Sequence, residues 1–252
     1  MDQRRLLINL ENIDFAFPGG EPVLKDVSFQ LREGERIGLI GPNGSGKTSL
    51  FHVIMGLLKP ESGRIEIFGK TVENESHFRA VRQKIGLLFQ DPDDQLFSPT
   101  VLEDVAFGPL NQGKSIAEAK KIARDTLESL GLSDVEDRIT YRMSGGEKRL
   151  VSLATVLAMK PQVLLLDEPT TGLDMETTEK MKGILTSLDL SYVFISHDMD
   201  FIAQTTDKLY GMINGRIVPG DETALHTHIH THGFGRLAHS HSHAGMLTEN
   251  PR

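Results

Sequence analysis

The sequence predicts an α/β protein with a mainly parallel β-sheet, an added antiparallel β layer and an inserted helical subdomain. Strand-like and helical stretches alternate along most of the chain, which favours a parallel sheet whose strands are joined by crossover helices. The start of the chain is rich in strand-like stretches, which indicates the antiparallel layer. The stretch from about 90 to 160 is mostly helical and interrupts the alternation, so we interpret it as the inserted subdomain.

The individual elements follow from hydrophobic periodicity and from the residues that begin and end helices. Strands are expected at about 6–14, 24–31, 35–40, 64–68, 84–89, 163–167, 191–195, 208–213 and 216–218. Helices are expected at about 47–57, 76–83, 115–130, 145–158, 175–188 and 199–206. Ser115 and Glu118 form a capping-box pattern, which supports a helix that starts at 115.

The composition is that of an ordinary globular chain and disfavours several function classes. Its 252 residues suit one large domain with a subdomain, which we expect at 1–219. The formal net charge of −8 disfavours a sequence-independent grip on nucleic acid, which needs clustered Lys and Arg. The chain has no cysteine, so disulfides and thiolate metal sites are excluded. Residues 1–10 are too polar for a signal peptide, and the sequence has no apolar run of about 18 residues. If the chain works at a membrane, we therefore expect other subunits to hold it there.

A glycine-rich segment has the pattern that binds nucleotide phosphates. It follows the strand-like run at 36–40 and precedes a helical run at 49–57. The glycines let backbone N–H groups turn toward phosphate oxygens, and the helix N-terminus adds positive potential. The residues that fit G-x-x-x-x-G-K-[ST] are Gly41, Pro42, Asn43, Gly44, Ser45, Gly46, Lys47 and Thr48. This P-loop predicts an ATPase core in which Lys47 reaches the β- and γ-phosphates of ATP and the Thr48 hydroxyl binds Mg²⁺.

Two carboxylates end the apolar strand predicted at 163–167. The carboxyl end of a parallel strand opens onto the ligand crevice of such a sheet. Asp167 therefore suits Mg²⁺, directly or through water, and Glu168 suits a general base that polarises the attacking water. Two acids after a strand often only begin a solvated loop, but the P-loop favours the catalytic interpretation.

A third motif begins the helix predicted at 145–158. Its residues are Met143, Ser144, Gly145, Gly146 and Glu147. Taken alone, Ser144 is a good helix N-cap after a loop. In this chain, however, the motif resembles Leu-Ser-Gly-Gly-Gln, the signature of the ATP-binding-cassette (ABC) family. Met143 replaces Leu and Glu147 replaces Gln, and both departures are mild.

Four further residues resemble elements of the same family, in the expected order. Phe17 resembles the aromatic residue that stacks on adenine, and Phe15 competes for that role. Gln90 follows the strand predicted at 84–89 and resembles the family's glutamine, which implies a catalytic role and a place among the Mg²⁺ ligands. Asp174 ends a Thr-Gly-Leu-Asp run that resembles the loop between two ATP sites. His197 resembles the switch histidine that contacts the γ-phosphate.

The resemblance covers about residues 6–218 and implies a mechanism. Two subunits sandwich two ATP molecules, and Ser144, Gly145 and Gly146 of one subunit face ATP held by the other. Hydrolysis removes the γ-phosphate, so the dimer opens. The family implies an ATPase bound to an integral membrane transport subunit on the cytoplasmic face of the cell membrane. A soluble ABC protein acting on DNA or ribosomes is the alternative, and the single cassette, the short spacing from Lys47 to Ser144 and the acidic charge disfavour it.

The segment from Phe89 to Pro109 resembles the ATPases of energy-coupling-factor importers, which take up vitamins and metals. Asp91 stands where those proteins often have Asn. The resemblance implies that this segment lies beside a groove that receives a helix of the membrane subunit. It also implies a separate substrate-binding membrane subunit, so nickel, cobalt and a vitamin all stay open as the substrate. The dimer partner is a second copy or a second ABC ATPase, and the intact catalytic elements favour a homodimer.

The last segment, 220–252, changes character and is expected to pack weakly or to be flexible, because it has little apolar periodicity. It carries seven of the ten histidines: His226, His228, His230, His232, His239, His241 and His243. Their spacing of two puts alternate side chains on one face of an extended chain, and neutral imidazoles bind Ni²⁺, Co²⁺, Cu²⁺ and Zn²⁺. A solvated tail without a role is the alternative. Combined with the family type, the histidines predict nickel or cobalt as the substrate.

Overall fold

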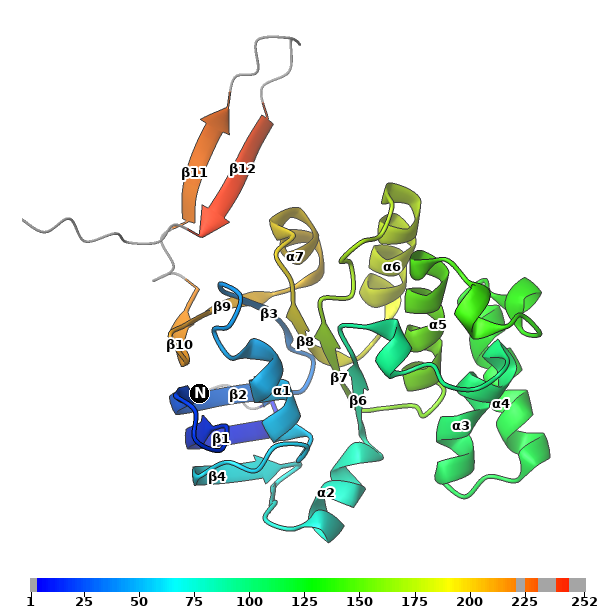
Figure 1. Cartoon of the computed structure of the whole chain (residues 1–252), viewed down its shortest axis with the longest axis horizontal. Helices are drawn as coiled ribbons and strands as arrows, with labels where there is room; N and C mark the ends of the chain where they lie inside the picture. Colours follow the sequence, from blue (N-terminus) through cyan, green and yellow to red (C-terminus); the bar gives the residue numbers. More distant parts are fainter. Residues whose placement is uncertain (1–3, 221–224, 231–238, 245–252) are drawn as a thin grey trace, which may run out of the picture.

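The computed structural model describes residues 4–220, 225–230 and 239–244. Within them, a six-stranded sheet runs through the molecule in the order β10-β9-β3-β8-β7-β6 (Figure 1). All neighbouring strands are parallel except the β9 and β10 pair. The bounds are β3 Arg36–Ile40, β6 Ile85–Leu88, β7 Val163–Asp167, β8 Ser191–Ile195, β9 Lys208–Ile213 and β10 Arg216–Pro219. The mainly parallel sheet predicted from the alternation is confirmed.

A second, antiparallel sheet confirms the added layer. Its order is β2-β1-β4-β5, with β1 Leu6–Ala16, β2 Pro22–Arg32, β4 Ser62–Ile67 and β5 Lys70–Thr71. Helix α1 (Lys47–Ile54) contributes Phe51 and Ile54 to one hydrophobic core with residues of both sheets. The P-loop helix is therefore packed against two sheets at once.

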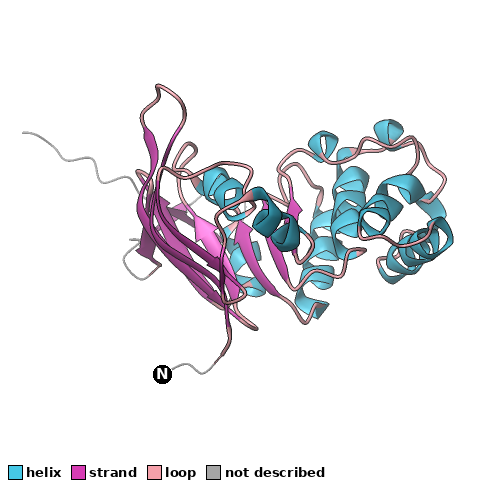
Figure 2. Cartoon of the chain, turned by 90° about the horizontal axis from the view of Figure 1, so that it is seen from below, coloured by secondary structure: helices cyan, strands magenta, loops and turns pink. Residues whose placement is uncertain are grey.

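A large cluster of helices lies on the opposite side of the molecule from the antiparallel sheet (Figure 2). The inserted subdomain contains α3 (Val101–Asn111), α4 (Ile116–Ser129) and α5 (Gly145–Leu157), with short 3₁₀ turns at Pro92–Asp94, Ser133–Val135 and Thr140–Arg142. The remaining helices are α2 Glu75–Arg82, α6 Met175–Ser187 and α7 Met199–Thr205. No described helix is long and apolar enough to cross a membrane.

Helix α3 was absent from the sequence-based prediction. The run Gly108-Pro109 near its end is typical of a helix breaker, which hides the element from pattern reading. The structure places Pro109 inside the last turn, while the start is fixed by a capping box between Thr100 and Glu103. The buried Val101 and Val105 then pack this helix into the core of the subdomain.

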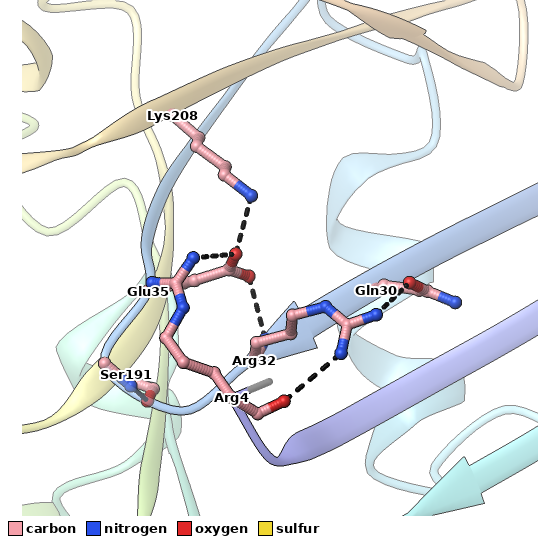
Figure 3. Close-up of polar contacts among 7 residues, drawn as sticks. Arg4, Gln30, Arg32, Glu35, Ser191 and Lys208 are labelled. Atoms are coloured by element: carbon pink, nitrogen blue, oxygen red, sulfur yellow. Dashed lines mark hydrogen bonds and ion pairs between the residues drawn. The ribbon is translucent and has the colours of Figure 1, made fainter. Parts of the chain in front are cut away.

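A buried carboxylate fixes the start of the strand that leads to the P-loop. Glu35 is 2% exposed and accepts hydrogen bonds from the Arg32 N–H at 2.8 Å, Arg4 Nη2 at 3.2 Å and Lys208 Nζ at 2.6 Å. Figure 3 shows the side chains of Arg4 and Lys208, both distant in sequence, and the nearby Arg32 backbone converging on Glu35. A buried carboxylate needs such partners, because leaving it unpaired is costly. The ends of β2, β3 and β9 are thereby held together.

The C-terminal segment contains a separate antiparallel pair, β11 (Leu225–His230) and β12 (His239–Ala244). Pattern reading did not predict these strands, because the segment lacks the apolar alternation that marks a strand. In the register, His226 pairs with His243, His228 with His241 and His230 with His239. His232 lies outside the described residues.

Candidate functional site

The functional side chains follow the carboxyl ends of four neighbouring parallel strands. Gly41 follows β3, His197 follows β8, Asp167 ends β7 and Gln90 follows β6. Because parallel strands end at one edge of the sheet, residues far apart in sequence meet there. Glu168 is the next residue after Asp167, so the same edge carries both carboxylates.

The P-loop conformation depends on its glycines. Gly46 is the N-cap of α1 with φ +105°, a backbone angle that L-residues avoid. At Gly41, an added Cβ would lie 2.2 Å from the Met212 carbonyl oxygen, so no side chain fits. Lys47 is 7% exposed and donates to the carbonyls of Gly41 at 2.7 Å and Pro42 at 3.1 Å. Burial lowers the pKa of its ammonium group, and the nearby Glu168 and Asp167 charges oppose that shift.

A cavity of about 400 Å³ lies in front of this loop. It is lined by the predicted residues Phe17, Asn43, Gly44, Ser45, Gly46, Lys47, Thr48, Gln90, Asp167 and Glu168. Val23, Ser49 and Ile195 also line it and were not predicted. Val23 and Ile195 give no signal in the sequence, since apolar strand residues usually lie in the core, whereas Ser49 could have been inferred from its place beside the P-loop. A site of this size and polarity suits a phosphate-bearing ligand.

The oxygen groups of Thr48, Gln90 and Asp167 fit a magnesium ion. Asp167 is 3% exposed, and its Oδ1 atom is buried without a hydrogen-bond partner among the described residues. Burial raises the pKa of this carboxyl group, and a hydrogen bond with Thr48 opposes the shift. A cation is the natural partner for such an orphaned oxygen, and Mg²⁺ prefers oxygen ligands.

Glu168 is held by three contacts in an unusual backbone conformation. Its φ is +48°, which is rare for a residue with a side chain. Its N–H donates to the Ile195 carbonyl at 3.0 Å, and its carboxylate contacts Thr171 Oγ1 at 3.1 Å and His197 Nε2 at 3.1 Å. The carboxylate is 9% exposed at the edge of the cavity. This arrangement can orient a water molecule and accept its proton.

The two aromatic candidates for adenine stacking have different environments. Phe15 is 5% exposed and belongs to the core, whereas Phe17 is 49% exposed and lines the cavity. Their rings pack edge to face with centroids 5.0 Å apart. Phe15 therefore supports Phe17, and only Phe17 has a face available for a base.

The residues Ser144, Gly145, Gly146 and Asp174 do not line this cavity. Ser144 caps α5 in a capping box with Glu147, and Asp174 caps α6 by accepting from the Thr177 N–H at 2.8 Å. An added Cβ on Gly146 would lie 3.2 Å from Thr177 Oγ1, so the starts of α5 and α6 are in contact. The start of α5, with Ser144, Gly145 and Gly146, is therefore a surface separate from the phosphate cavity, and we call it the signature surface.

Two residues that sequence reasoning missed connect the edge of the phosphate cavity to α5. Arg149 of α5 is 4% exposed and donates to the carbonyls of Phe89 at 2.7 Å and Gln90 at 2.5 Å. Gln95 accepts from the Phe89 N–H at 3.2 Å and donates to the Ser152 carbonyl of α5 at 2.8 Å. Burial lowers the pKa of the Arg149 guanidinium, and nearby carboxylates oppose the shift. Both side chains contact backbone atoms, which no sequence pattern marks.

The tail histidines remain a prediction as metal ligands. The structure gives the backbone register of six of them, in β11 and β12, but not their side chains. Among the side chains that it does describe, no group of three or more His, Asp or Glu is arranged to hold a metal ion.

Comparisons with known proteins agree with this geometry. Residues 24–171 match the ABC transporter family. A chain from Nitratidesulfovibrio vulgaris, named as an ABC transporter ATP-binding protein, is 46% identical over 97% of this chain and 89% of its own length. The energy-coupling factor transporter ATP-binding protein EcfA of Methanothermobacter thermautotrophicus is 42% identical over 84% of this chain and 70% of its own. The cobalt import ATP-binding protein CbiO of Rhodobacter capsulatus is 42% identical over 84% of this chain and 77% of its own.

Solved structures share the fold. The cbiO1 protein of Clostridium perfringens, described as part of the ABC transporter complex cbiONQ, is 34% identical with a TM-score of 0.75, over 85% of this chain and 87% of that one. An ATP-binding cassette captured as a dimer with ADP and phosphate is 27% identical with a TM-score of 0.77, over 84% of this chain and 96% of that one. With the match over 24–171 and these relatives, the chain belongs to the ABC transporter family as an ATP-binding subunit.

Proposed function

We propose that this ATP-binding subunit hydrolyses ATP for an energy-coupling-factor type importer of nickel or cobalt ions. The observation that carries the ATPase assignment is the cavity that Lys47, Asp167 and Glu168 line together. The two carboxylate charges lie close enough to Lys47 to oppose the effect of burial on the pKa of its ammonium group. The importer type rests on the 89–109 segment and on relatives named for energy coupling and cobalt import. A vitamin or another small molecule is the alternative substrate.

In the reaction ATP + water → ADP + phosphate, different residues bind the phosphates, hold the metal ion and accept the proton. Backbone N–H groups of the P-loop and the Lys47 ammonium bind the phosphates. Thr48, Gln90 and Asp167 would hold Mg²⁺, which supplies charge neutralisation on the phosphate oxygens when bound. Glu168 accepts the proton of the attacking water, and His197, next to it, contacts the γ-phosphate. Glu168, whose φ is positive, lines the cavity.

Each ATP site is completed by a second subunit, which is either another copy of this chain or a second ABC ATPase. The signature surface lies away from the cavity of its own chain, so we assign it to ATP held by the partner. The N-terminus of α5 presents free N–H groups and a positive dipole end, which suit a γ-phosphate. Relatives captured as dimers support this assembly.

A groove on the helical side suits a helix of the integral membrane subunit. Its volume is about 790 Å³, and its lining includes Leu57, Phe89, Gln95, Phe97, Phe107 and Met159. Phe97 is 65% exposed and packs edge to face on Phe107, with ring centroids 4.7 Å apart. The groove also has charged lining residues, among them Glu75, Arg79 and Arg82. Exposed aromatic side chains beside a groove are typical of interaction sites. Docking there would hold the chain on the cytoplasmic face of the membrane, next to a substrate-binding membrane subunit.

The paired strands β11 and β12 support a second role, reversible binding of Ni²⁺ or Co²⁺. Cross-strand partners lie on one face of a two-stranded ribbon, with Cβ atoms roughly 5 Å apart. The backbone register pairs His226 with His243, His228 with His241 and His230 with His239, and Thr227, Ser240 and Ser242 occupy alternate positions. Two imidazoles across such a pair can bind one transition-metal ion.

Transport in reconstituted vesicles tests the substrate. The ATPase is combined with its membrane subunits in liposomes, and ATP-dependent uptake of Ni²⁺, Co²⁺ and a water-soluble vitamin is measured. We expect uptake of one of the two metals, abolished by the Glu168→Gln variant. Uptake of the vitamin alone would overturn the metal assignment and leave the ATPase assignment intact.

Calorimetric titration tests the tail. Ni²⁺, Co²⁺ and Zn²⁺ are titrated into the full chain, a chain truncated after Pro219, and a variant with the six paired histidines changed to Asn. We expect binding only in the full chain, lost below about pH 6 because metals need neutral imidazoles. The matched control changes Thr227, Ser240 and Ser242 to Ala and keeps the binding. Equal affinity in the truncated chain would move the site elsewhere.

A further inference from the structure

The start of α5 carries a carboxylate on hydrogen-bond donors that a phosphate would use. Glu147 Oε2 accepts from the Ser144 N–H at 2.9 Å and from the Ser144 hydroxyl at 3.0 Å. The proposed function directs the same hydroxyl at the γ-phosphate of ATP held by the partner. In the isolated chain, the carboxylate therefore occupies a donor of the signature surface that has to be released before it can bind phosphate.

The carboxylate also adds a negative charge to a surface assigned to an anion. Glutamate and phosphate are both favoured at a helix N-terminus, so Glu147 and a phosphate compete for the first turn of α5. Like charges at such short range repel each other. The glutamine of the family signature can form the same capping box without a charge. With Glu147 in that position, phosphate binding here requires a group that offsets the charge.

Arg138 is placed to offset it. Its Nη1 atom lies 2.5 Å from Glu147 Oε1 and its Nη2 atom lies 3.4 Å from Oε2, so the guanidinium faces both carboxylate oxygens. The planar fork of an arginine matches a carboxylate in this way, whereas a lysine ammonium is a point charge. The guanidinium can therefore keep hold of the carboxylate when Ser144 releases Oε2.

The backbone of Arg138 is anchored outside α5. Its N–H donates to the Val135 carbonyl at 3.0 Å, and its carbonyl accepts from the Val101 N–H, at the start of α3, at 3.1 Å. These bonds do not involve the signature surface. The position of the arginine is therefore set independently of the hydrogen bonds that Ser144 makes.

We propose that Arg138 is a positioning residue of the signature surface, which neutralises the Glu147 carboxylate and holds it aside so that the γ-phosphate of the partner's ATP can replace it on Ser144. This inference rests on the proposed function as a dimeric ATPase. Arg138 does not line the phosphate cavity of its own chain. Its effect is therefore on the ATP-dependent association of two subunits and not on ATP binding by one.

A double-mutant cycle in the Glu168→Gln background tests the inference. The dimer dissociation constant is measured by light scattering at saturating ATP, and ATP affinity is measured on dilute protein with a fluorescent nucleotide. Arg138→Met should weaken association by about 5-fold per site, the upper value for a partly exposed ion pair, and by about 25-fold in a dimer with two sites. In the Glu147→Gln background, Arg138→Met should have no effect. ATP affinity should stay unchanged in every variant.

Two further readouts separate this role from a merely structural one. The effect of Arg138→Met should shrink as the salt concentration rises, because salt screens the repulsion between exposed charges and does not repair a packing defect. Arg138→Lys keeps the positive charge and should restore most of the association. The matched control Arg124→Met removes a similarly exposed pair with Glu136, 3.1 Å long, in the same subdomain, and should leave association unchanged.

An equal effect of Arg138→Met with and without Glu147→Gln would overturn the inference, because the arginine would then act through the fold and not through this carboxylate. Association of Arg138→Met as tight as that of the Glu168→Gln parent would overturn it as well. A parent that stays monomeric with ATP would instead overturn the dimeric function on which the inference rests.

Discussion

The phosphate cavity and the signature surface of this chain differ in how much of their binding geometry the described residues supply. The phosphate cavity is enclosed by four strand ends, a helix N-terminus and buried charges, and it retains an orphaned carboxylate oxygen on Asp167. The signature surface is a capped helix start whose polar groups bond to one another, as Ser144 and Glu147 do. The phosphate cavity therefore contains a buried polar atom that lacks a hydrogen-bond partner among the described residues and can bind a ligand. In the signature surface, the capping groups of Ser144 and Glu147 are paired with each other, and the other N–H groups of the first turn are left for a second molecule.

The largest expected effect comes from a variant that disables the phosphate cavity alone. Glu168→Gln should lower ATP turnover by about 10²- to 10⁴-fold, the usual contribution of a general base, while ATP binding persists because the phosphate contacts remain. Steady-state phosphate release and nucleotide binding measure the two effects. The control Glu128→Gln removes an exposed carboxylate on α4 and should leave turnover unchanged. Turnover of Glu168→Gln near that of wild type would remove this residue from catalysis.

The next effect is complementation between two variants, one with a damaged phosphate cavity and one with a damaged signature surface. Lys47→Ala should abolish nucleotide binding in its own cavity, and Ser144→Arg should block the signature surface by steric and charge conflict. In a mixed dimer both lesions fall in one composite site and leave the other intact. We expect two inactive variants to regain activity when mixed, unless the sites are strictly coupled. A monomeric, ATP-bound Glu168→Gln protein in light scattering would contradict the sandwich.

A smaller effect distinguishes two neighbouring aromatic rings. Phe17→Ala should weaken ATP affinity by roughly 1–3 kcal/mol, the usual value of stacking on a base, with little change in melting temperature. Phe15→Ala should instead destabilise the fold by roughly 3–5 kcal/mol, because its ring is buried. Nucleotide titration and thermal unfolding of both variants decide the assignment. A normal affinity in Phe17→Ala would assign adenine to another surface.

The smallest expected effect concerns Glu147, the carboxylate that caps the helix at the signature surface. The Ser144 amide and then Arg138 lower the pKa of Glu147 below its ordinary 4.5. A lowered pKa means that this carboxylate stabilises the fold above the ordinary value and loses that contribution as pH falls through the lowered one. The melting temperature of Glu147→Gln should therefore depend less on pH between about 5 and 3 than that of wild type. Parallel curves for the two proteins would show that the capping carboxylate contributes nothing.

The comparison also explains what the sequence could predict. The sequence could predict that the P-loop, Asp167 and Glu168 lie beside strand ends, because apolar strands and glycine-rich turns have a recognisable local sequence pattern. Helix α3 was missed because Gly108 and Pro109 resemble a breaker, although the packing of Val101 and Val105 outweighs their cost. Arg149 could not be singled out from the sequence, because its hydrogen-bond partners are backbone carbonyl groups, which every residue has. Sequence patterns mark side chains that need a special residue type, and they miss those that contact only backbone.

The backbone of Glu168 has a consequence for any attempt to make this protein more heat tolerant. A left-handed conformation costs a residue with a side chain about 1–3 kcal/mol, and glycine adopts it freely. Glu168→Gly is thus expected to raise thermal stability while it deletes the proposed base. A library screened only for survival on heating would accumulate that substitution and return robust, inactive subunits, so such a screen needs turnover as a second criterion.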